Sequence, residues 1–177
     1  MFNKKSAFGG SDITIPSLKS FAFLVLVMLF SVFAANNLFS QDKDKIKDGI
    51  NKVFEMFNKG DLTGVEKYID AGYIEHTLAP GQKEGLDGFK EMMESFKKAF
   101  PDIKFTINDI IISDNKAAVL STINGTNTGE FMGMPATNKK VTIMGIDWLV
   151  FNKENKCIEH WGYEDDMGMM QQLGMMK

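Results

Sequence analysis

The last strand-like segment of the chain, residues 157–164, carries aromatic side chains and leads into two aspartates. Trp161, Tyr163 and Asp165 are two residues apart, and side chains alternate along a β-strand, so we expect all three on one face. Two aromatic rings and one carboxylate would then line an apolar pocket that suits proton transfer on a small organic ligand. Asp165 is therefore the first candidate for a catalytic acid or base. His160 is out of phase with these residues, and we expect it to face away.

The same position has a second interpretation. Aspartate is favoured at helix N-caps, and Asp165 and Asp166 precede a short apolar, methionine-rich segment that could form a helix. Adjacent side chains point in different directions, so one aspartate can cap the helix while the other faces the pocket. The spacing leaves both roles open for Asp165.

Three other polar residues are candidates for the same pocket. Asp147 lies between Ile146 and Trp148 in an otherwise apolar segment, where a charge needs a partner or a pocket. It is the second candidate acid or base. His76 precedes a Pro-Gly loop and could be a pocket donor or a structural hydrogen-bonding residue. Glu130 follows a glycine-containing segment that could place it at a cavity mouth, or leave it as a solvated loop carboxylate.

The composition excludes several classes of function. All 20 basic residues are lysine, and the net charge is −3. Nucleic-acid-binding surfaces normally use arginine and a positive field, so we expect no nucleic-acid partner. The 2 histidines are far apart and give no recognisable metal site. Cys157 is the only cysteine, so no intramolecular disulfide can form.

The first forty residues differ from the rest. Three lysines precede an almost unbroken apolar run over residues 21–35, which is followed by small and polar residues. This order is typical of a secretory signal, and the run is shorter than the roughly 20 residues of a spanning helix. We expect residues 1–40 to be a signal peptide, with export to the periplasm or the extracellular space. The alternative is an uncleaved membrane anchor at residues 21–35. Residues 41–177 form the expected domain.

Three helices and then a series of strands are expected in this domain. Apolar residues recur at helical spacing over residues 46–57, 61–69 and 86–100, and Gly60 and Pro101 end the first and third helices. The sequence then alternates between apolar and polar residues.

Four long antiparallel strands follow, over residues 103–111, 117–127, 141–151 and 157–164. The fold class is therefore α+β. A long sheet twists and curls, and helices on its concave face would leave a cone-shaped apolar cavity.

Three motifs in order and at specific spacing carry a family resemblance. They are Tyr73-Ile74-Glu75-His76 with the Glu84–Phe89 helix start; Gly125–Pro135 with Thr137, Lys139 and Val141; and Ile158–Asp165 with Gly168 and Gln171–Gly174. With these motifs, residues 46–174 resemble the SnoaL-like polyketide cyclases, also called ester cyclases, which share the cone-shaped fold of nuclear transport factor two. The family often has histidine where this chain has Asn127, and a second proline where it has Ala136.

The resemblance implies a function and a site. Characterised cyclases of this family use an aspartate as general acid/base for an intramolecular aldol closure, without metal or cofactor. Asp165 is the residue that matches this aspartate, and His76 and Glu130 match pocket-lining positions. We expect cofactor-free acid/base chemistry on a small hydrophobic or aromatic ligand, with Trp161 and Tyr163 as pocket walls. The alternatives are a non-catalytic binding module of the cell envelope and a dimerisation module, since the outer face of such sheets often pairs.

Overall fold

The computed structural model of the protein describes residues 43–79 and 81–176. They belong to one compact unit. The predicted signal peptide or anchor, residues 1–40, lies outside the described residues and stays a prediction. Within the described part of the chain, no helix is both long and apolar enough to cross a membrane.

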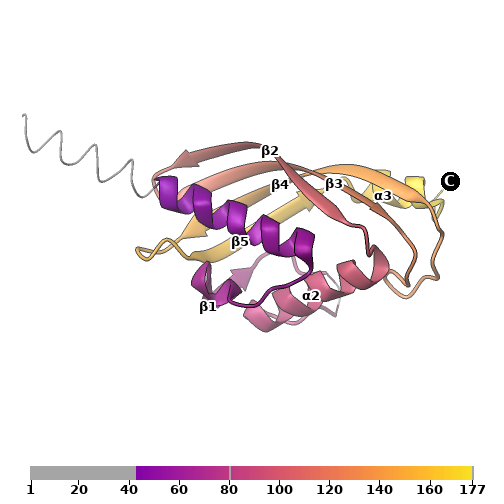
Figure 1. The fold of residues 1–177 in the computed structure, drawn as a ribbon, viewed down its shortest axis with the longest axis horizontal. Coiled ribbons are helices and arrows are strands. Elements are labelled where there is room, and N and C mark those ends of the chain that lie inside the picture. The colour runs from indigo at the N-terminus through magenta and orange to yellow at the C-terminus, as the bar shows by residue number, and fades with distance from the viewer. Residues whose placement is uncertain (1–42, 80, 177) are drawn as a thin grey trace, which may run out of the picture. The chain divides into compact units, whose positions relative to one another are not determined.

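Two helices lie on the same face of the sheet (Figure 1). The first covers residues 43–59 and ends at Gly60, whose φ of +70° suits glycine. The second, α2 (Gly85–Ala99), ends where Pro101 prevents its continuation. Both were predicted from their apolar spacing. The predicted helix at residues 61–69 is instead a single 3-10 turn, η1 (Val65–Lys67).

The sheet has five strands in the order β1-β5-β4-β3-β2 and is open. Four of them form the predicted antiparallel series: β2 (Lys104–Ser113), β3 (Lys116–Thr126), β4 (Lys140–Phe151) and β5 (Cys157–Glu164). The fifth, β1 (Ile69–Glu75), pairs with β5 in parallel, so the sheet is mixed rather than purely antiparallel. The α+β class and the curved sheet beneath helices are as predicted.

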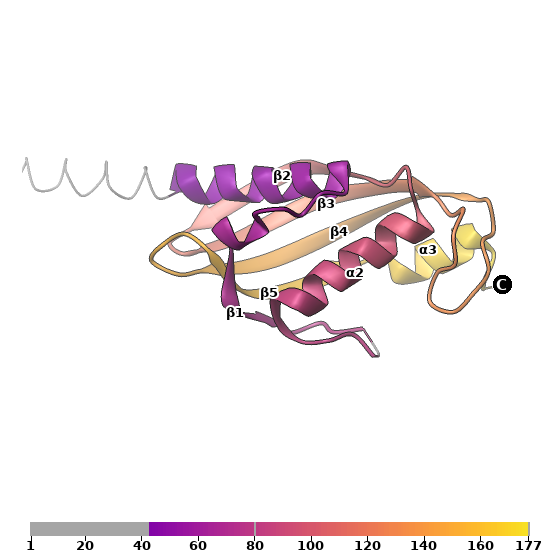
Figure 2. The ribbon, with the colours of Figure 1, turned by 60° about the horizontal axis from the view of Figure 1, so that its bottom comes forward.

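The core has two parts along the concave face. Ile46 and Ile50 of the first helix and Phe89 of α2 pack against inward residues of the sheet such as Val119. Farther along the sheet, Phe100 belongs to a second cluster, which also contains residues of the C-terminal helix, α3 (Asp166–Leu173). Figure 2 shows the 43–59 helix and α2 in front of the sheet and α3 at one end of it. The helices therefore cover only the inner face.

The outer face of the sheet carries exposed apolar side chains. The large ones on β2, β4 and β5 are Ile111, Met144, Ile146, Trp148 and Tyr163. Exposed apolar patches of this kind are typical of interaction surfaces. Pairing of two copies through this face, one of the alternatives drawn from the sequence, stays a prediction.

Candidate active site

A cavity of about 580 Å³ lies between the inner face of the sheet and the two helices that cover it. This volume is in the range of small-molecule sites. Most of its lining is apolar and aromatic, including Phe54, Phe57, Phe89, Phe96 and Phe131. Leu78 and Met132 also line the cavity but are exposed, so it opens to solvent beside them. The cavity can therefore enclose an apolar molecule of moderate size.

The face of β5 that lines this cavity is the opposite of the one predicted. His160, Gly162 and Glu164 face the cavity, whereas Trp161 and Tyr163 do not line it. The cause is a register shift: Phe151 pairs with Cys157, but Val150 pairs with Glu159. Residue 158 is therefore an extra residue of the bulge type, which inverts the alternation after the inward-facing Cys157. The placement of both aromatic residues in the pocket was wrong.

Asp165 also lies elsewhere than predicted. It is exposed and is not among the cavity-lining residues. Its carboxylate accepts a hydrogen bond of 2.9 Å from the backbone N–H of Gly168, which makes it the N-cap of α3. Of the two interpretations of Asp165, the cap is the one that the geometry supports.

The other two loop candidates are outside the cavity lining as well. His76 is stacked on Trp161, with ring centroids 3.9 Å apart, and its Nε2 is 3.0 Å from a carboxylate oxygen of Glu159. Glu130 is exposed, although its neighbour Phe131 does line the cavity. Both residues were candidates for the pocket, and neither lines it.

Asp147 does lie in the cavity, where it is part of a cluster of ionisable groups. The imidazole of His160 lies between two carboxylates, with Nδ1 2.6 Å from Glu75 Oε2 and Nε2 2.9 Å from Asp147 Oδ1. The hydroxyl of Tyr73 donates to the same Glu75 oxygen at 2.7 Å. Thr77 donates to the other Glu75 oxygen through both its N–H (3.0 Å) and its hydroxyl (2.7 Å). The cluster thus joins β1, β5 and β4.

These contacts set the charges in the cluster. Burial disfavours a charged His160, but the hydrogen bonds to Asp147 and Glu75 outweigh it and raise the pKa of His160 from 6.5 to about 9. Burial likewise works against a charged Glu75, yet His160, Tyr73 and Thr77 lower the pKa of its carboxyl to about 2. At neutral pH the cluster contains an imidazolium with both N–H groups engaged.

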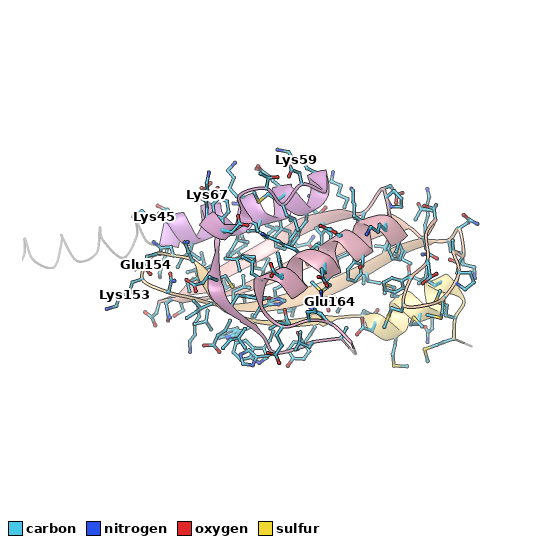
Figure 3. All side chains as sticks on the ribbon, turned by 90° about the horizontal axis from the view of Figure 1, so that it is seen from below. Lys45, Lys59, Lys67, Lys153, Glu154 and Glu164 are labelled. Atoms are coloured by element: carbon cyan, nitrogen blue, oxygen red, sulfur yellow. The ribbon has the colours of Figure 1, made fainter. Side chains whose placement is uncertain are left out.

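Glu164 has the opposite perturbation. Burial is the largest cause, and repulsion from Asp147 and Asp166 adds to it, so the pKa of Glu164 rises from 4.5 to about 7. The residue is nevertheless exposed, so it contacts solvent as well as the cavity that it lines. In the view of Figure 3 Glu164 is labelled close to α2, whereas Lys45, Lys59 and Lys153 lie at the outer edge of the picture. A carboxyl with this pKa can both accept and donate a proton near pH 7.

Two strand glycines make room for these groups. A Cβ atom on Gly162 would lie 3.0 Å from His160 Cε1 and 3.2 Å from Glu164 Oε1. A Cβ atom on Gly145, which pairs with Glu164 across β4 and β5, would lie 3.1 Å from Glu164 Cγ. The sequence reasoning missed Tyr73, Glu75, His160 and Glu164. The signal that could have found the last two is Gly162, because glycine inside a strand often marks the close approach of another group.

The remaining reactive groups give no further site. Cys157 lines the cavity, but burial raises the pKa of its thiol to about 12, so it is not a thiolate near neutral pH. Among residues 43–79 and 81–176, no group of three or more His, Cys, Asp or Glu side chains is arranged to hold a metal ion.

An open, curved sheet with helices on its concave side and a cluster of ionisable groups in the enclosed cavity defines a cone-shaped α+β protein. The family model of SnoaL-like polyketide cyclases matches residues 49–173, and the chain belongs to this family. Its fold is the one shared with nuclear transport factor two. The chain matches no curated protein sequence.

Solved structures with the same fold come from several bacteria. TsrD from Streptomyces laurentii is 20% identical with a TM-score of 0.70, over 75% of this chain and 97% of that one. IdmH from Streptomyces antibioticus, a candidate polyketide cyclase, is 26% identical with a TM-score of 0.64, over 73% and 98% of the two chains. A SnoaL-like polyketide cyclase from Agrobacterium tumefaciens is 19% identical with a TM-score of 0.62, over 73% and 98%.

Proposed function

We propose that this protein catalyses cofactor-free acid/base chemistry, such as an intramolecular aldol cyclisation, on a small and largely apolar ligand bound in the cavity. The observation that carries the proposal is Glu164, a carboxyl that lines an apolar cavity and has its pKa raised to about 7. Family membership supports this class of reaction. We assign to Glu164 the proton transfer expected of Asp165, because the Asp165 carboxylate caps α3.

The reaction would proceed in two steps. In its charged form, Glu164 removes a proton from the carbon next to a ligand carbonyl, so that the C–H bond breaks and its electron pair forms an enolate. The enolate carbon then attacks a second carbonyl of the same molecule and forms a C–C bond. The proton held by Glu164 returns to the resulting alkoxide oxygen. The product is an isomer of the substrate, and the reaction consumes no co-substrate.

The neighbouring cluster would provide positive charge and rigidity. His160 is charged at neutral pH, and its attraction lowers the pKa of Glu164 against the effects of burial and of Asp147. Its ring is fixed by Glu75 on one side and Asp147 on the other, so the positive charge is preorganised. A non-catalytic carrier is less well supported, because an apolar carrier does not require several ionisable groups inside its cavity.

Proton abstraction can be tested before the natural substrate is known. The probe is 2-tetralone, a bicyclic ketone whose acidic C–H groups exchange with deuterium in D₂O, followed by NMR. We expect the protein to accelerate this exchange, with a rate that rises with pH and levels off above the Glu164 pKa of about 7, because the charged form is the base. Glu164→Gln keeps the size of the side chain and should slow exchange by about 100-fold or more.

Two other variants complete the design. Glu154→Gln changes an exposed carboxylate at the β4–β5 turn and should leave the exchange rate unchanged. Asp165→Asn tests the residue that the sequence favoured. Loss of exchange in Asp165→Asn with retention in Glu164→Gln would assign the base to Asp165 and contradict the proposal. No acceleration by the unmodified protein would contradict it too.

A further inference from the structure

Among the described residues, the carboxyl and basic side chains that line the cavity are almost all acidic. They are Glu75, Asp147, Glu164 and Asp166, with His160 as the one basic residue. No lysine is among the cavity-lining residues of the described chain, and the sequence contains no arginine. The lysines labelled in Figure 3 lie at the periphery of the fold. A ligand in the cavity therefore meets an excess of negative charge.

His160 cannot offset this excess for a ligand. Both of its ring nitrogens are already within hydrogen-bonding distance of carboxylates, at 2.6 Å from Glu75 and 2.9 Å from Asp147. The three groups together carry a net negative charge when all are ionised. An anionic ligand group would find no free N–H of this ring to bind.

Glu164 and Asp166 differ from the two carboxylates of the cluster. Within residues 43–79 and 81–176, neither side chain has a hydrogen bond or an ion pair to another side chain. Asp166 is exposed at the start of α3, where the cavity meets solvent. Both residues are exposed and line the cavity, so their charges act on whatever enters it.

We propose that the cavity selects its ligands by charge: it admits uncharged and cationic apolar molecules and excludes anionic ones, with Glu164 and Asp166 as the residues that set this preference. Free carboxylic acids would bind poorly, whereas ketones, esters, phenols and amines of similar shape would bind well. The inference rests on the proposed function only in taking the cavity as the ligand site. It adds the class of molecule that the site accepts.

Three fluorescent probes with one aromatic body can test this selection. Dansylglycine is an anion, dansylamide is uncharged and dansylcadaverine is a cation at about pH 8, where Glu164 with its pKa of about 7 is mostly charged. Fluorescence titration gives the Kd of each. We expect dansylamide to bind about 10-fold or more tightly than dansylglycine, and dansylcadaverine at least as tightly as dansylamide.

Adjacent aspartates provide a matched control. Asp166→Asn and Glu164→Gln should each reduce the ratio of the Kd of dansylglycine to the Kd of dansylamide. Asp165→Asn makes the same change in net charge one residue away, outside the cavity lining, and should leave this ratio of Kd values unchanged. Thermal unfolding followed by circular dichroism checks that each variant is folded.

Equal affinity for the anionic and uncharged probes, or failure of all three probes to bind, would overturn the proposal. An equal reduction of the Kd ratio by Asp165→Asn and Asp166→Asn would also overturn it, because the effect would then come from the net charge of the protein. These titrations require no turnover. Charge selection that persists while the protein fails to accelerate deuterium exchange would contradict the proposed function alone.

Discussion

The two faces of the sheet differ in which charged and aromatic side chains they carry. The inner face places charged Glu75, Asp147 and His160 beneath the helices, whereas the outer face exposes Trp148 and Tyr163 to solvent. Soluble proteins normally bury aromatic residues and expose charges. The inner face therefore combines a core with a cluster of charges around the cavity, and the exposed apolar side chains of the outer face are of the kind found at interaction surfaces.

The histidines on the two faces give the largest expected contrast. His160→Asn leaves the carboxylates of Glu75 and Asp147 buried without a cation, and should lower the free energy of unfolding by about 3–5 kcal/mol. His76→Asn removes a half-exposed pair with Glu159 and should cost only about 0–1 kcal/mol. Urea denaturation measures both. If His160→Asn lowered the free energy of unfolding as little as His76→Asn does, the cluster on the inner face would not be what holds these strands together.

The stabilisation from His160 also has a defined pH dependence. Its pKa is raised from 6.5 in the unfolded chain to about 9 in the fold, so its contribution is complete below pH 6.5 and is lost as the pH rises through about 9. Thermal unfolding of the unmodified protein should show this alkaline decrease, and His160→Asn should lack it.

Two isoleucines on β4, one on each face, allow the contribution of the two faces to stability to be compared with the same residue type. Ile143 is inward and 4% exposed, while Ile146 is outward and 50% exposed. Ile143→Ala should lower the free energy of unfolding by about 2–5 kcal/mol, because it leaves a void in the core. Ile146→Ala should change it by no more than about 0.5 kcal/mol in a monomer. A larger loss in Ile146→Ala that grows with protein concentration would indicate that two copies pair through the outer face.

The smallest effect is expected where β5 passes into α3. Asp165→Ala removes the cap on α3 and should cost about 1 kcal/mol, whereas Asp165→Asn retains a capping side chain and should be nearly neutral. Chemical denaturation measures the difference. Equal losses in both variants would show that the charge of Asp165, rather than its hydrogen bond to Gly168, is what matters at this position.

The sequence predicted most of the architecture but only part of the site. The apolar spacing of the helices and the alternation along β2, β3 and β4 predict their positions closely, because burial imposes those periods. Asp147 was placed correctly for the same reason. The parallel pairing of β1 with β5 depends on contacts distant in sequence, which local patterns do not encode.

The error in β5 has a single origin. Unbroken alternation from the inward-facing Cys157 would put Trp161, Tyr163 and Asp165 inward. Two aromatic rings and a carboxylate on one face matched what a ligand pocket requires, so this phase was the one predicted. The register shift beside Cys157 moves His160, Gly162 and Glu164 inward instead. A bulge of this kind is set by pairing with the neighbouring strand, so the alternation along β5 alone does not reveal it.

The extra residue at position 158 also affects how relatives should be matched to this chain. A family member that lacks the insertion could share every letter of the following motif and still present the opposite set of side chains to its ligand. Residue roles are therefore transferable only between members whose strand pairing is the same, and superposed backbones are a safer basis for that transfer than aligned letters.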